Sequence, residues 1–327
     1  MKVFITGATG YIGEQLALAL AARQFEVVAL VRSPEQATTL RTAGITLLQG
    51  DLDSVAVLEK GMQQCQAVLH LAAYARLWPE NEAIFRKVNI EGTCHVADAA
   101  LKNKVQRLIF TSTAGVFGPS ASAAEPVTED TNKSVPHTSA YEATKAEAEK
   151  LLKTYVPKGL EVIILNPTRV YGPGKESESN AVNKLISLYM KGKWRFLPGN
   201  GQSIGNYCFT EDIVSAHINA IALGKSGHNY LLGGHNISYK ELFDSVAQVT
   251  GQHHRLYKVP AKLLHVVSQL LVAGAKLTNS KPLLTPKWLQ KYLNNWCVSS
   301  QKAQKELQYT ITPLAVGLKK TIDYIKE

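Results

Sequence analysis

Short hydrophobic runs alternate with longer segments of helical periodicity along the first half of the chain. The runs are rich in Val, Ile and Leu and occupy 3–6, 27–31, 46–48, 67–71, 108–112 and 161–166. The segments between them, among which 14–23, 80–102 and 139–155 stand out, are long enough to be crossover helices. Continuously apolar strands separated by helices are typical of a parallel sheet that is covered on both faces. The pattern therefore predicts an α/β fold with a doubly wound parallel sheet.

A glycine-rich loop follows the first predicted strand and opens the first predicted helix. Its sequence is Gly7-Ala8-Thr9-Gly10-Tyr11-Ile12-Gly13. Glycines permit a tight turn and a close approach to the backbone, and the free N–H groups at the start of the helix can hold a pyrophosphate. The alternative is a strand-to-helix turn that binds nothing. The context favours a Rossmann-type dinucleotide site, with Gly7, Thr9, Gly10, Tyr11, Ile12 and Gly13 as binding residues.

The end of the second predicted strand bears on which dinucleotide is bound. NAD sites of this type place a carboxylate roughly 20 residues after the loop, at the ribose. Here the strand ends in Leu30-Val31-Arg32-Ser33, and the first acid after that end is Glu35. A guanidinium suits a 2′-phosphate, so we expect NADP rather than NAD; a solvated surface arginine is the other interpretation of Arg32. Asp51, after the third strand, is expected either at the adenine amino group or in a helix-capping turn.

The regular alternation of predicted strands and helices ends after residue 166. Loops rich in Pro and Gly, such as 172–174 and 198–201, are followed by mainly helical pieces, and 229–233 is expected to return a strand to the sheet. We therefore expect a dinucleotide-binding domain of residues 1–165 with a returning segment near 206–234. Residues 166–205 and 235–327 would form a smaller, mainly helical substrate lobe.

Composition describes an ordinary globular protein with an excess of basic residues. The chain has 327 residues, 45% of them hydrophobic, and 36 Lys+Arg against 26 Asp+Glu give a net charge of +10. Four scattered cysteines form no C-x-x-C pair, which argues against a metal cage or a redox dithiol and favours a reducing, cytoplasmic compartment. No export leader is expected, because the first residues run directly into the glycine loop. No stretch has the length of a membrane span.

The segment Tyr141-Glu142-Ala143-Thr144-Lys145 carries the candidate chemistry. A phenol and an ammonium four residues apart share one face of a helix. We expect the ammonium to lower the pKa of Tyr141, which would make the phenol a usable proton donor to a carbonyl oxygen. By itself the spacing also fits an ordinary amphipathic helix. Its combination with the glycine loop and with the hydroxyl-rich strand end Thr111-Ser112-Thr113 favours catalysis.

With these motifs in place, the chain resembles the extended short-chain dehydrogenase/reductases, which include sugar-nucleotide epimerases, dihydroflavonol reductases and 3β-hydroxysteroid dehydrogenases. The resemblance covers nearly the whole chain. Its landmarks are Gly7–Gly13, Asp51-Leu52, His70-Leu71-Ala72-Ala73, Val88–Thr93, Phe110–Gly118, Tyr141–Lys145, Asn166–Gly174 and Thr210–Ile213.

The resemblance implies a role for each matching residue. Tyr141 would be the general acid and base, Lys145 would bind the nicotinamide ribose, and Thr113 would hydrogen-bond the substrate oxygen. His70 is expected to be a structural histidine and Asn89 an orienting hydrogen-bonding residue beside the cofactor. The remaining residues expected at the cofactor are Leu52, Leu71, Ala72, Ala73, Thr111, Pro167 and Val170. A homodimer is also implied.

The choice of branch rests on a charge that this chain lacks and on two strand ends, 30–34 and 110–115, which resemble those of the dihydroflavonol-reductase and steroid-dehydrogenase branch. Nucleotide-sugar members usually carry an arginine where this chain has Gly205, although Arg195 is near enough in sequence to substitute. The expected function is therefore reduction of a ketone, or oxidation of a secondary alcohol, on a fairly apolar small molecule, as in the dihydroflavonol-reductase and steroid-dehydrogenase branch. The alternatives are a nucleotide-sugar epimerase or dehydratase with tightly bound NAD, and a non-catalytic dinucleotide sensor.

The basic excess lies in one part of the chain. Residues 1–252 hold 24 Lys+Arg and 23 Asp+Glu, whereas residues 253–327 hold 12 and 3. A nucleic-acid partner is not expected, because no recognition motif accompanies this charge. The apolar segment 262–276 lies within the basic region and is expected to wall a pocket, to pack within the lobe or to touch a membrane surface. The substrate is accordingly expected to be apolar or amphiphilic.

Overall fold

The computed structural model describes residues 1–76, 82–131, 136–175, 180–278, 282 and 285–327. A seven-stranded parallel sheet has the strand order β10-β6-β5-β4-β1-β2-β3. The predicted Rossmann-type α/β fold and the predicted return of 229–233 to the sheet are confirmed. The strands are β1 (Lys2–Thr6), β2 (Glu26–Val31), β3 (Thr46–Gln49), β4 (Ala67–His70), β5 (Arg107–Thr111), β6 (Glu161–Pro167) and β10 (Asn229–Leu232).

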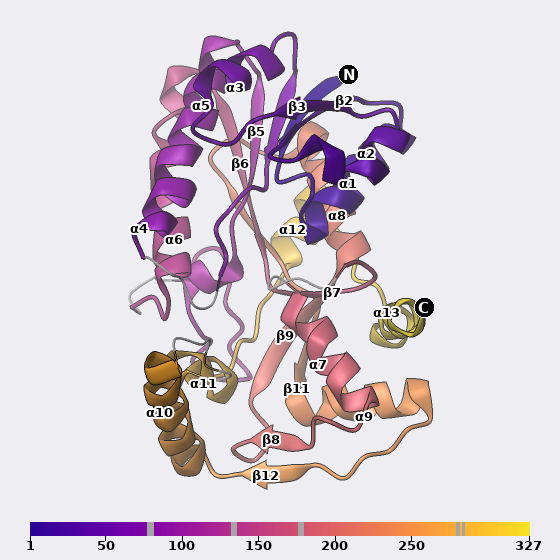
Figure 1. Ribbon diagram of the computed structural model, residues 1–327. Helices are drawn as coiled ribbons and strands as arrows, with labels where there is room; N and C mark the ends of the chain where they lie inside the picture. Colours follow the sequence, from indigo (N-terminus) through magenta and orange to yellow (C-terminus); the bar gives the residue numbers. More distant parts are fainter. Residues whose placement is uncertain (77–81, 132–135, 176–179, 279–281, 283–284) are drawn as a thin grey trace.

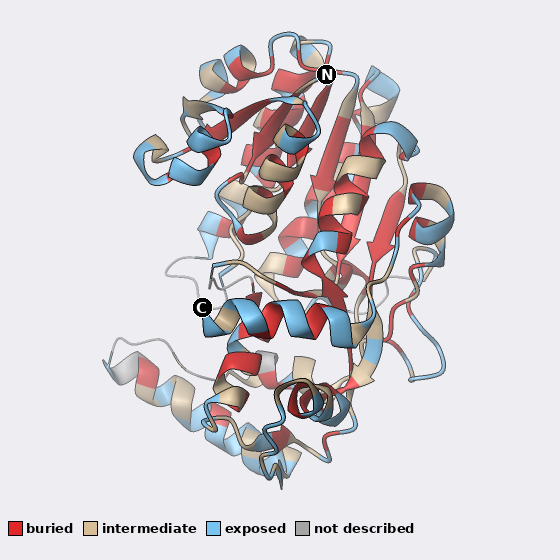
Figure 2. Ribbon diagram, turned by 90° about the vertical axis from the view of Figure 1, so that its right-hand side faces the viewer, coloured by how far each residue is buried: buried red, intermediate tan, exposed pale blue. Residues whose placement is uncertain are grey.

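The inner strands are mainly apolar because both faces of the sheet are covered, whereas the edge strand β3 is partly exposed. In β1, Val3 and Ile5 belong to an apolar cluster on one face, and Phe4 belongs to a second cluster on the other. The first face packs on α1 (Tyr11–Ala22), α8 (Thr210–Leu223) and α12 (Gln301–Leu307). The second packs on α3 (Val55–Gly61), α5 (Gly92–Lys102) and α6 (Ala140–Lys153). Figure 2 shows the sheet as the buried centre of the larger lobe.

The predicted helix over 80–102 is interrupted. Residues 80 and 81 lie outside the described part of the chain, and from there α4 (Ala83–Arg86) leads through a π-helical segment, η2 (Lys87–Glu91), into α5. A π-helical turn widens the helix by one residue per turn and often marks a functional position. The expected site residue Asn89 lies in this turn.

A smaller lobe lies beyond the carboxyl ends of the strands (Figure 1). A three-stranded sheet in the order β11-β9-β7 and a two-stranded sheet of β8 and β12 form its frame. Its strands are β7 (Arg169–Tyr171), β8 (Phe196–Pro198), β9 (Ile204–Phe209), β11 (His235–Ser238) and β12 (Tyr257–Val259). Its helices are α7 (Ala181–Met190), α9 (Tyr239–Thr250), α10 (Ala261–Thr278), α11 (Pro286–Leu293) and α13 (Leu314–Lys326).

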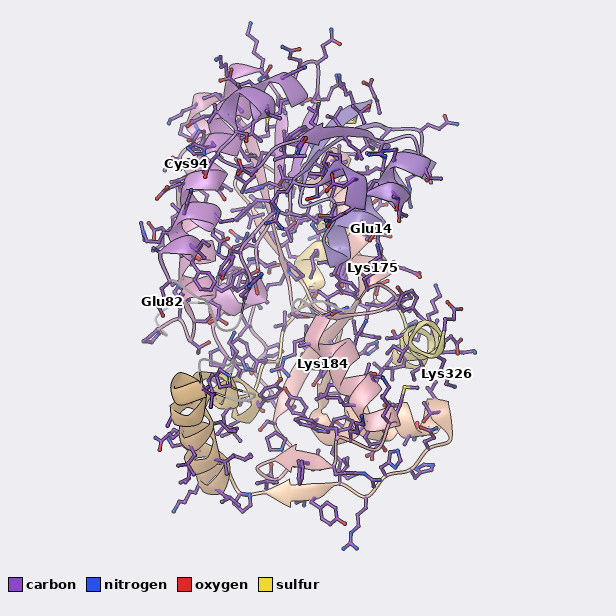
Figure 3. All side chains as sticks on the ribbon, in the orientation of Figure 1. Glu14, Glu82, Cys94, Lys175, Lys184 and Lys326 are labelled. Atoms are coloured by element: carbon purple, nitrogen blue, oxygen red, sulfur yellow. The ribbon has the colours of Figure 1, made fainter. Side chains whose placement is uncertain are left out.

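The remaining short elements are η1 (Pro34–Gln36), α2 (Thr38–Thr42), η3 (Ala114–Phe117) and η4 (Val156–Lys158). Contacts between the lobes include an ion pair of 3.5 Å from Lys175 Nζ to Glu14 Oε1, two residues that Figure 3 labels. Among the described residues, no helix is both long and apolar enough to cross a membrane.

Candidate active site

The sequence motifs of the larger lobe gather at the carboxyl edge of the sheet. Thr6 lies opposite Leu30 on one side and His70 on the other, and His70 lies opposite Phe110. The segments that follow β1, β2, β4 and β5 therefore leave the sheet beside one another. In open α/β sheets this edge is where ligands bind.

The glycine loop is shaped to let a ligand approach the backbone. Gly7 has a φ of +75°, and a Cβ at this position would lie 2.6 Å from the backbone nitrogen of Ala72. A Cβ at Gly13 would overlap the carbonyl oxygen of Gly7. The Gly10 amide donates to that same oxygen over 3.0 Å, and α1 begins at Tyr11 without a side-chain cap. This cradle of uncapped amides fits the pyrophosphate of a dinucleotide.

Two loop side chains have different surroundings. Thr9 is exposed beside the cradle. Tyr11 is buried, and its hydroxyl donates to the Gly172 carbonyl over 2.8 Å and lies 3.0 Å from Thr210 Oγ1. The phenol therefore joins α1 to the second half of the chain. Because its hydroxyl has these partners, Tyr11 would contact a cofactor through its backbone.

The residues expected near the adenosine lie after β2 and β3. Arg32 directly follows β2 and is exposed. Asp51 forms the expected turn, because its Oδ1 accepts from Ser54 Oγ over 2.7 Å and from the Asp53 amide over 3.1 Å. The hydrogen bond from Ser54 lowers the pKa of Asp51. Leu52 is buried against Gly92, where a Cβ would lie 2.7 Å from Leu52 Cδ1.

Asn89 fixes the loop that follows β4. Its Oδ1 accepts from the Tyr74 amide over 2.7 Å, and its Nδ2 donates to the Tyr74 carbonyl and to Thr144 Oγ1, each over 3.1 Å. Asn89 thus joins the loop to α6. Leu71, Ala72 and Ala73 in this loop are partly exposed at the carboxyl edge. Asn89 orients the loop through these bonds, and its expected place beside the cofactor stays a prediction.

His70 is buried and bonded through both ring nitrogens. Nδ1 lies 2.7 Å from Thr6 Oγ1, and Nε2 lies 3.0 Å from Thr93 Oγ1. Burial, aided by the charge of Lys145, lowers the pKa of His70 to about 3. A neutral imidazole held on both sides is a structural element of the sheet edge.

Helix α6 carries Tyr141 and Lys145 one turn apart. The Ser139 side chain caps the helix by accepting from the Glu142 amide. Lys145 is 1% exposed, and its ammonium lies 3.8 Å from the centroid of the Phe110 ring on β5. This contact fastens the Tyr141–Lys145 face of α6 to the carboxyl end of the sheet.

The expected lowering of the Tyr141 pKa by Lys145 is not found. Burial, aided by the charge of Glu142, raises the pKa of Tyr141 to about 12. Burial also lowers the pKa of Lys145 to about 7, against the opposing effect of Glu149. A phenolate and an ammonium attract each other, but desolvation disfavours the charged form of both groups and outweighs this attraction here.

The three hydroxyls at the carboxyl end of β5 point to different partners. Thr111 Oγ1 lies 2.7 Å from His217 Nε2 on α8, and Ser112 Oγ donates to Glu149 Oε1 over 2.5 Å. Thr113 Oγ1 accepts from the Gly115 amide over 3.2 Å and faces a pocket of about 110 Å³. Of the three, only Thr113 lines this pocket. Pro167 and Val170, expected beside the nicotinamide, are buried at the end of β6 and in β7.

Sequence reasoning missed the buried carboxylate of Glu149, one turn beyond Lys145. Its Oε1 also accepts from Asn166 Nδ2 over 2.6 Å, and its Oε2 accepts from Asn229 Nδ2 over 2.9 Å. Asn166 in turn donates to the Thr113 carbonyl over 3.2 Å. Glu149 therefore joins α6 to three strand ends and positions Thr113. The four-residue spacing of Tyr141, Lys145 and Glu149 was the available signal.

The pocket beside Thr113 has a mixed polar and apolar lining that crosses between the lobes. Its residues are Thr113, Ala114, Gly115, Glu142, Thr168, Arg169, Asn206, Lys291, Trp296 and Val298. Glu142 Oε1 pairs with Lys291 Nζ over 2.5 Å. Among the residues that the structure describes, none from helix α10 lines this pocket, and neither does Arg195, the predicted substitute for a missing clamp. Arg169 and the Glu142–Lys291 pair were not predicted.

Known proteins are similar to this chain along most of its length. The sequence model of the NAD dependent epimerase/dehydratase family matches residues 3–233. A 3beta-hydroxysteroid-dehydrogenase/decarboxylase of Arabidopsis thaliana is 28% identical over 98% of this chain and 78% of its own length. A putative dihydroflavonol 4-reductase of Synechocystis is 28% identical over 76% of this chain and 72% of its own.

The fold comparison agrees. The crystal structure of gox2253 superposes with a TM-score of 0.84 at 27% identity, covering 99% of this chain and 97% of that chain. The chain therefore belongs to the NAD dependent epimerase/dehydratase family and is an enzyme of the nicotinamide-dependent oxidoreductase type.

Proposed function

We propose that the protein is an NADP(H)-dependent reductase that interconverts a ketone and a secondary alcohol on a fairly apolar small molecule. The observation that carries the proposal is the pairing of Tyr141 and Lys145 on α6, next to the strand end that presents Thr113. The glycine cradle opens at the same edge of the sheet. A proton donor, a cation and a hydroxyl at this edge are the groups that carbonyl reduction needs.

Each residue has a role in this proposal. The dinucleotide, when bound, supplies or accepts the hydride. Thr113 holds the carbonyl oxygen, and Tyr141 gives that oxygen its proton. Lys145 holds the ribose hydroxyls and stabilises the phenolate that proton transfer leaves on Tyr141. Leu71, Ala72, Ala73, Pro167 and Val170 form the apolar walls of the cofactor groove.

The proposed preference for NADP rests on Arg32. Its guanidinium is exposed directly after β2, at the carboxyl edge where the adenosine of a dinucleotide lies in folds of this type. The planar, charged group can take a 2′-phosphate through two hydrogen bonds. In the same proposal, residues 1–165 with 206–234 bind the dinucleotide, and residues 166–205 and 235–327 bind the substrate.

Helix α10 supports peripheral contact with an anionic lipid surface. Leu263, Val266, Val267 and Leu270 follow helical spacing and are 53%, 53%, 38% and 66% exposed. Residues 253–278 contain four Lys or Arg and no Asp or Glu. An apolar stripe within a basic segment suits the interface of a bilayer that carries negative charge. A homodimer is proposed from the family resemblance.

Thermal-shift titration with NADP(H) and NAD(H), followed by a panel of ketones with the better nucleotide, tests the proposed function. We expect NADP(H) to raise the melting temperature at lower concentration, and one or more ketones to consume NADPH at 340 nm. Tightly retained NAD(H) with no net absorbance change during turnover would contradict a reductase. It would favour the internal redox cycle of an epimerase.

A further inference from the structure

Arg169 is a cation enclosed by neutral groups. From the start of β7, its Nη1 donates to Tyr239 Oη over 2.5 Å and to Tyr207 Oη over 3.4 Å, and its Nη2 donates to the Lys291 carbonyl over 3.2 Å. Its Cζ also lies 5.3 Å, 5.7 Å and 5.9 Å from the ring centroids of Tyr239, Tyr207 and Tyr292. Burial raises the pKa of Tyr207 and of Tyr239, so both phenols stay uncharged.

These contacts leave the charge of Arg169 without a counter-ion. In the described part of the chain, no carboxylate oxygen lies within 4.0 Å of its guanidinium nitrogens. Three of the five N–H donors are used by the three bonds above, so two remain for another acceptor. A partly buried guanidinium without an opposite charge is destabilising, and a ligand carboxylate would offset that cost.

The charge balance of the pocket leads to the same conclusion. Its ionisable lining residues are Glu142, Arg169 and Lys291. Glu142 is compensated by Lys291, and its second oxygen accepts from the amide and hydroxyl of Thr138 over 2.9 Å and 2.6 Å. The pocket therefore keeps one net positive charge, at Arg169. A single charge in about 110 Å³ matches a carboxylate better than a phosphate, which carries closer to two negative charges.

Gly205 fixes where this charge lies. A Cβ at position 205 would overlap Arg169 Nη1 and lie 2.8 Å from Tyr207 Oη. Because position 205 of β9 has no side chain, the guanidinium can lie against the tyrosine rings. Thr113, which would hold the reacting oxygen, lines the same pocket.

We propose that Arg169 binds a carboxylate on the substrate, so that the enzyme acts on a keto acid or hydroxy acid with an apolar remainder. The inference rests on the proposed function, because it assumes that the pocket beside Thr113 receives the substrate. The carboxylate would accept two hydrogen bonds from Arg169, while Asn206 and Lys291 form the polar wall around it. The carbonyl end would face Thr113.

Binding can be tested without knowing the substrate. The probes are aliphatic monocarboxylates from butanoate to decanoate and the amide of each, titrated by thermal shift with and without NADPH. For the wild type we expect the carboxylate to bind on the order of tenfold to a hundredfold more tightly than its amide, the range of a charge-assisted bond. Arg169→Gln should lose this difference, and Arg169→Lys should keep part of it. Arg255→Gln, at an exposed arginine of the same lobe, is the control and should behave as the wild type.

The outcomes separate this inference from the proposed function. Equal binding of acid and amide by the wild type, or an unchanged preference in Arg169→Gln, would overturn the carboxylate site. If Arg169→Gln does not fold, Arg169→Lys decides: a preference for the acid equal to that of the wild type, with no weakening, would overturn the site. Tyr141→Phe should keep the preference whether or not it turns over. A carboxylate preference in a protein that reduces no ketone would refute the reductase and leave the anion site standing.

Discussion

The Lys145 ammonium lies 3.8 Å from the centroid of the Phe110 ring, in a position where the lysine is 1% exposed. The ring face attracts the cation. Burial destabilises the charged form by more than this attraction stabilises it, so the pKa of Lys145 falls to about 7. The lysine is therefore near its titration point at neutral pH.

This burial makes stability depend on pH through Lys145. Between about pH 7 and 10 the unfolded chain holds a proton on this lysine that the folded chain has lost, so stability should rise with pH. Lys145→Met removes the group. Urea unfolding at pH 7, 8 and 9 should show the wild type gaining about 1.4 kcal/mol per pH unit relative to this variant. If the free energies of unfolding of the two proteins changed with pH in parallel, this would contradict the lowered pKa of Lys145.

Gly7 should be intolerant of alanine for a reason that Gly44 does not share. Both have a φ of +75°, but a Cβ at Gly7 would meet the backbone of Leu71 and Ala72, whereas nothing lies within 4 Å of a Cβ at Gly44. Gly44→Ala should cost about 1–2 kcal/mol from the backbone conformation alone. Gly7→Ala should cost more and should weaken nucleotide binding. Equal losses of stability in urea, with nucleotide affinity intact in both variants, would contradict the cradle.

The assignment of Arg32 to the 2′-phosphate predicts a selective loss. Arg32→Gln should weaken NADPH binding by about tenfold or more and leave NADH binding unchanged, because only one of the two nucleotides carries the phosphate. Fluorescence titration with both nucleotides measures the difference. Arg23→Gln is the control, since Arg23 is exposed at the far end of α1. A similar loss for both nucleotides would make Arg32 a general contact rather than a discriminator.

The exposed stripe of α10 predicts reversible binding to anionic vesicles. Flotation with vesicles that contain phosphatidylserine should recover the wild type at low salt and less of it at high salt, because screening weakens the basic contribution. Leu263→Glu combined with Leu270→Glu should abolish flotation, and Val316→Glu, at an exposed apolar residue of α13, should not. Wild-type protein that stays with the unbound fraction at all salt concentrations would remove the membrane proposal.

The central sheet could be predicted because its inner strands are covered on both faces. Such strands are apolar at consecutive positions, as in Val27 to Val31. They can therefore be recognised in the sequence without knowledge of their tertiary contacts. The three-stranded sheet of the smaller lobe gave no such signal, since β7 and β11 have only three and four residues and lie beside Pro- and Gly-rich turns. The division into a dinucleotide lobe and a substrate lobe stays a prediction.

The candidate site was predictable where its residues are close in sequence. Tyr141 and Lys145 share a helical face, and Gly7, Gly10 and Gly13 lie at the turn from β1 into α1, so spacing was enough. The surroundings of Arg169 come from Tyr207, Tyr239 and Tyr292, which only the fold brings together. The pKa values also depend on burial, which only the fold determines. This is why the expected lowering of the Tyr141 pKa by Lys145 was wrong.

The most direct test of the proposed chemistry is the rate of NADPH oxidation at 340 nm by the wild type and by Tyr141→Phe, with the best ketone of the panel. The variant removes one hydroxyl and should retain the thermal shift caused by NADPH. We predict that kcat falls by about a hundredfold or more, since no other group is proposed to give the carbonyl oxygen its proton. A Tyr141→Phe protein that turns over at the wild-type rate would contradict the account.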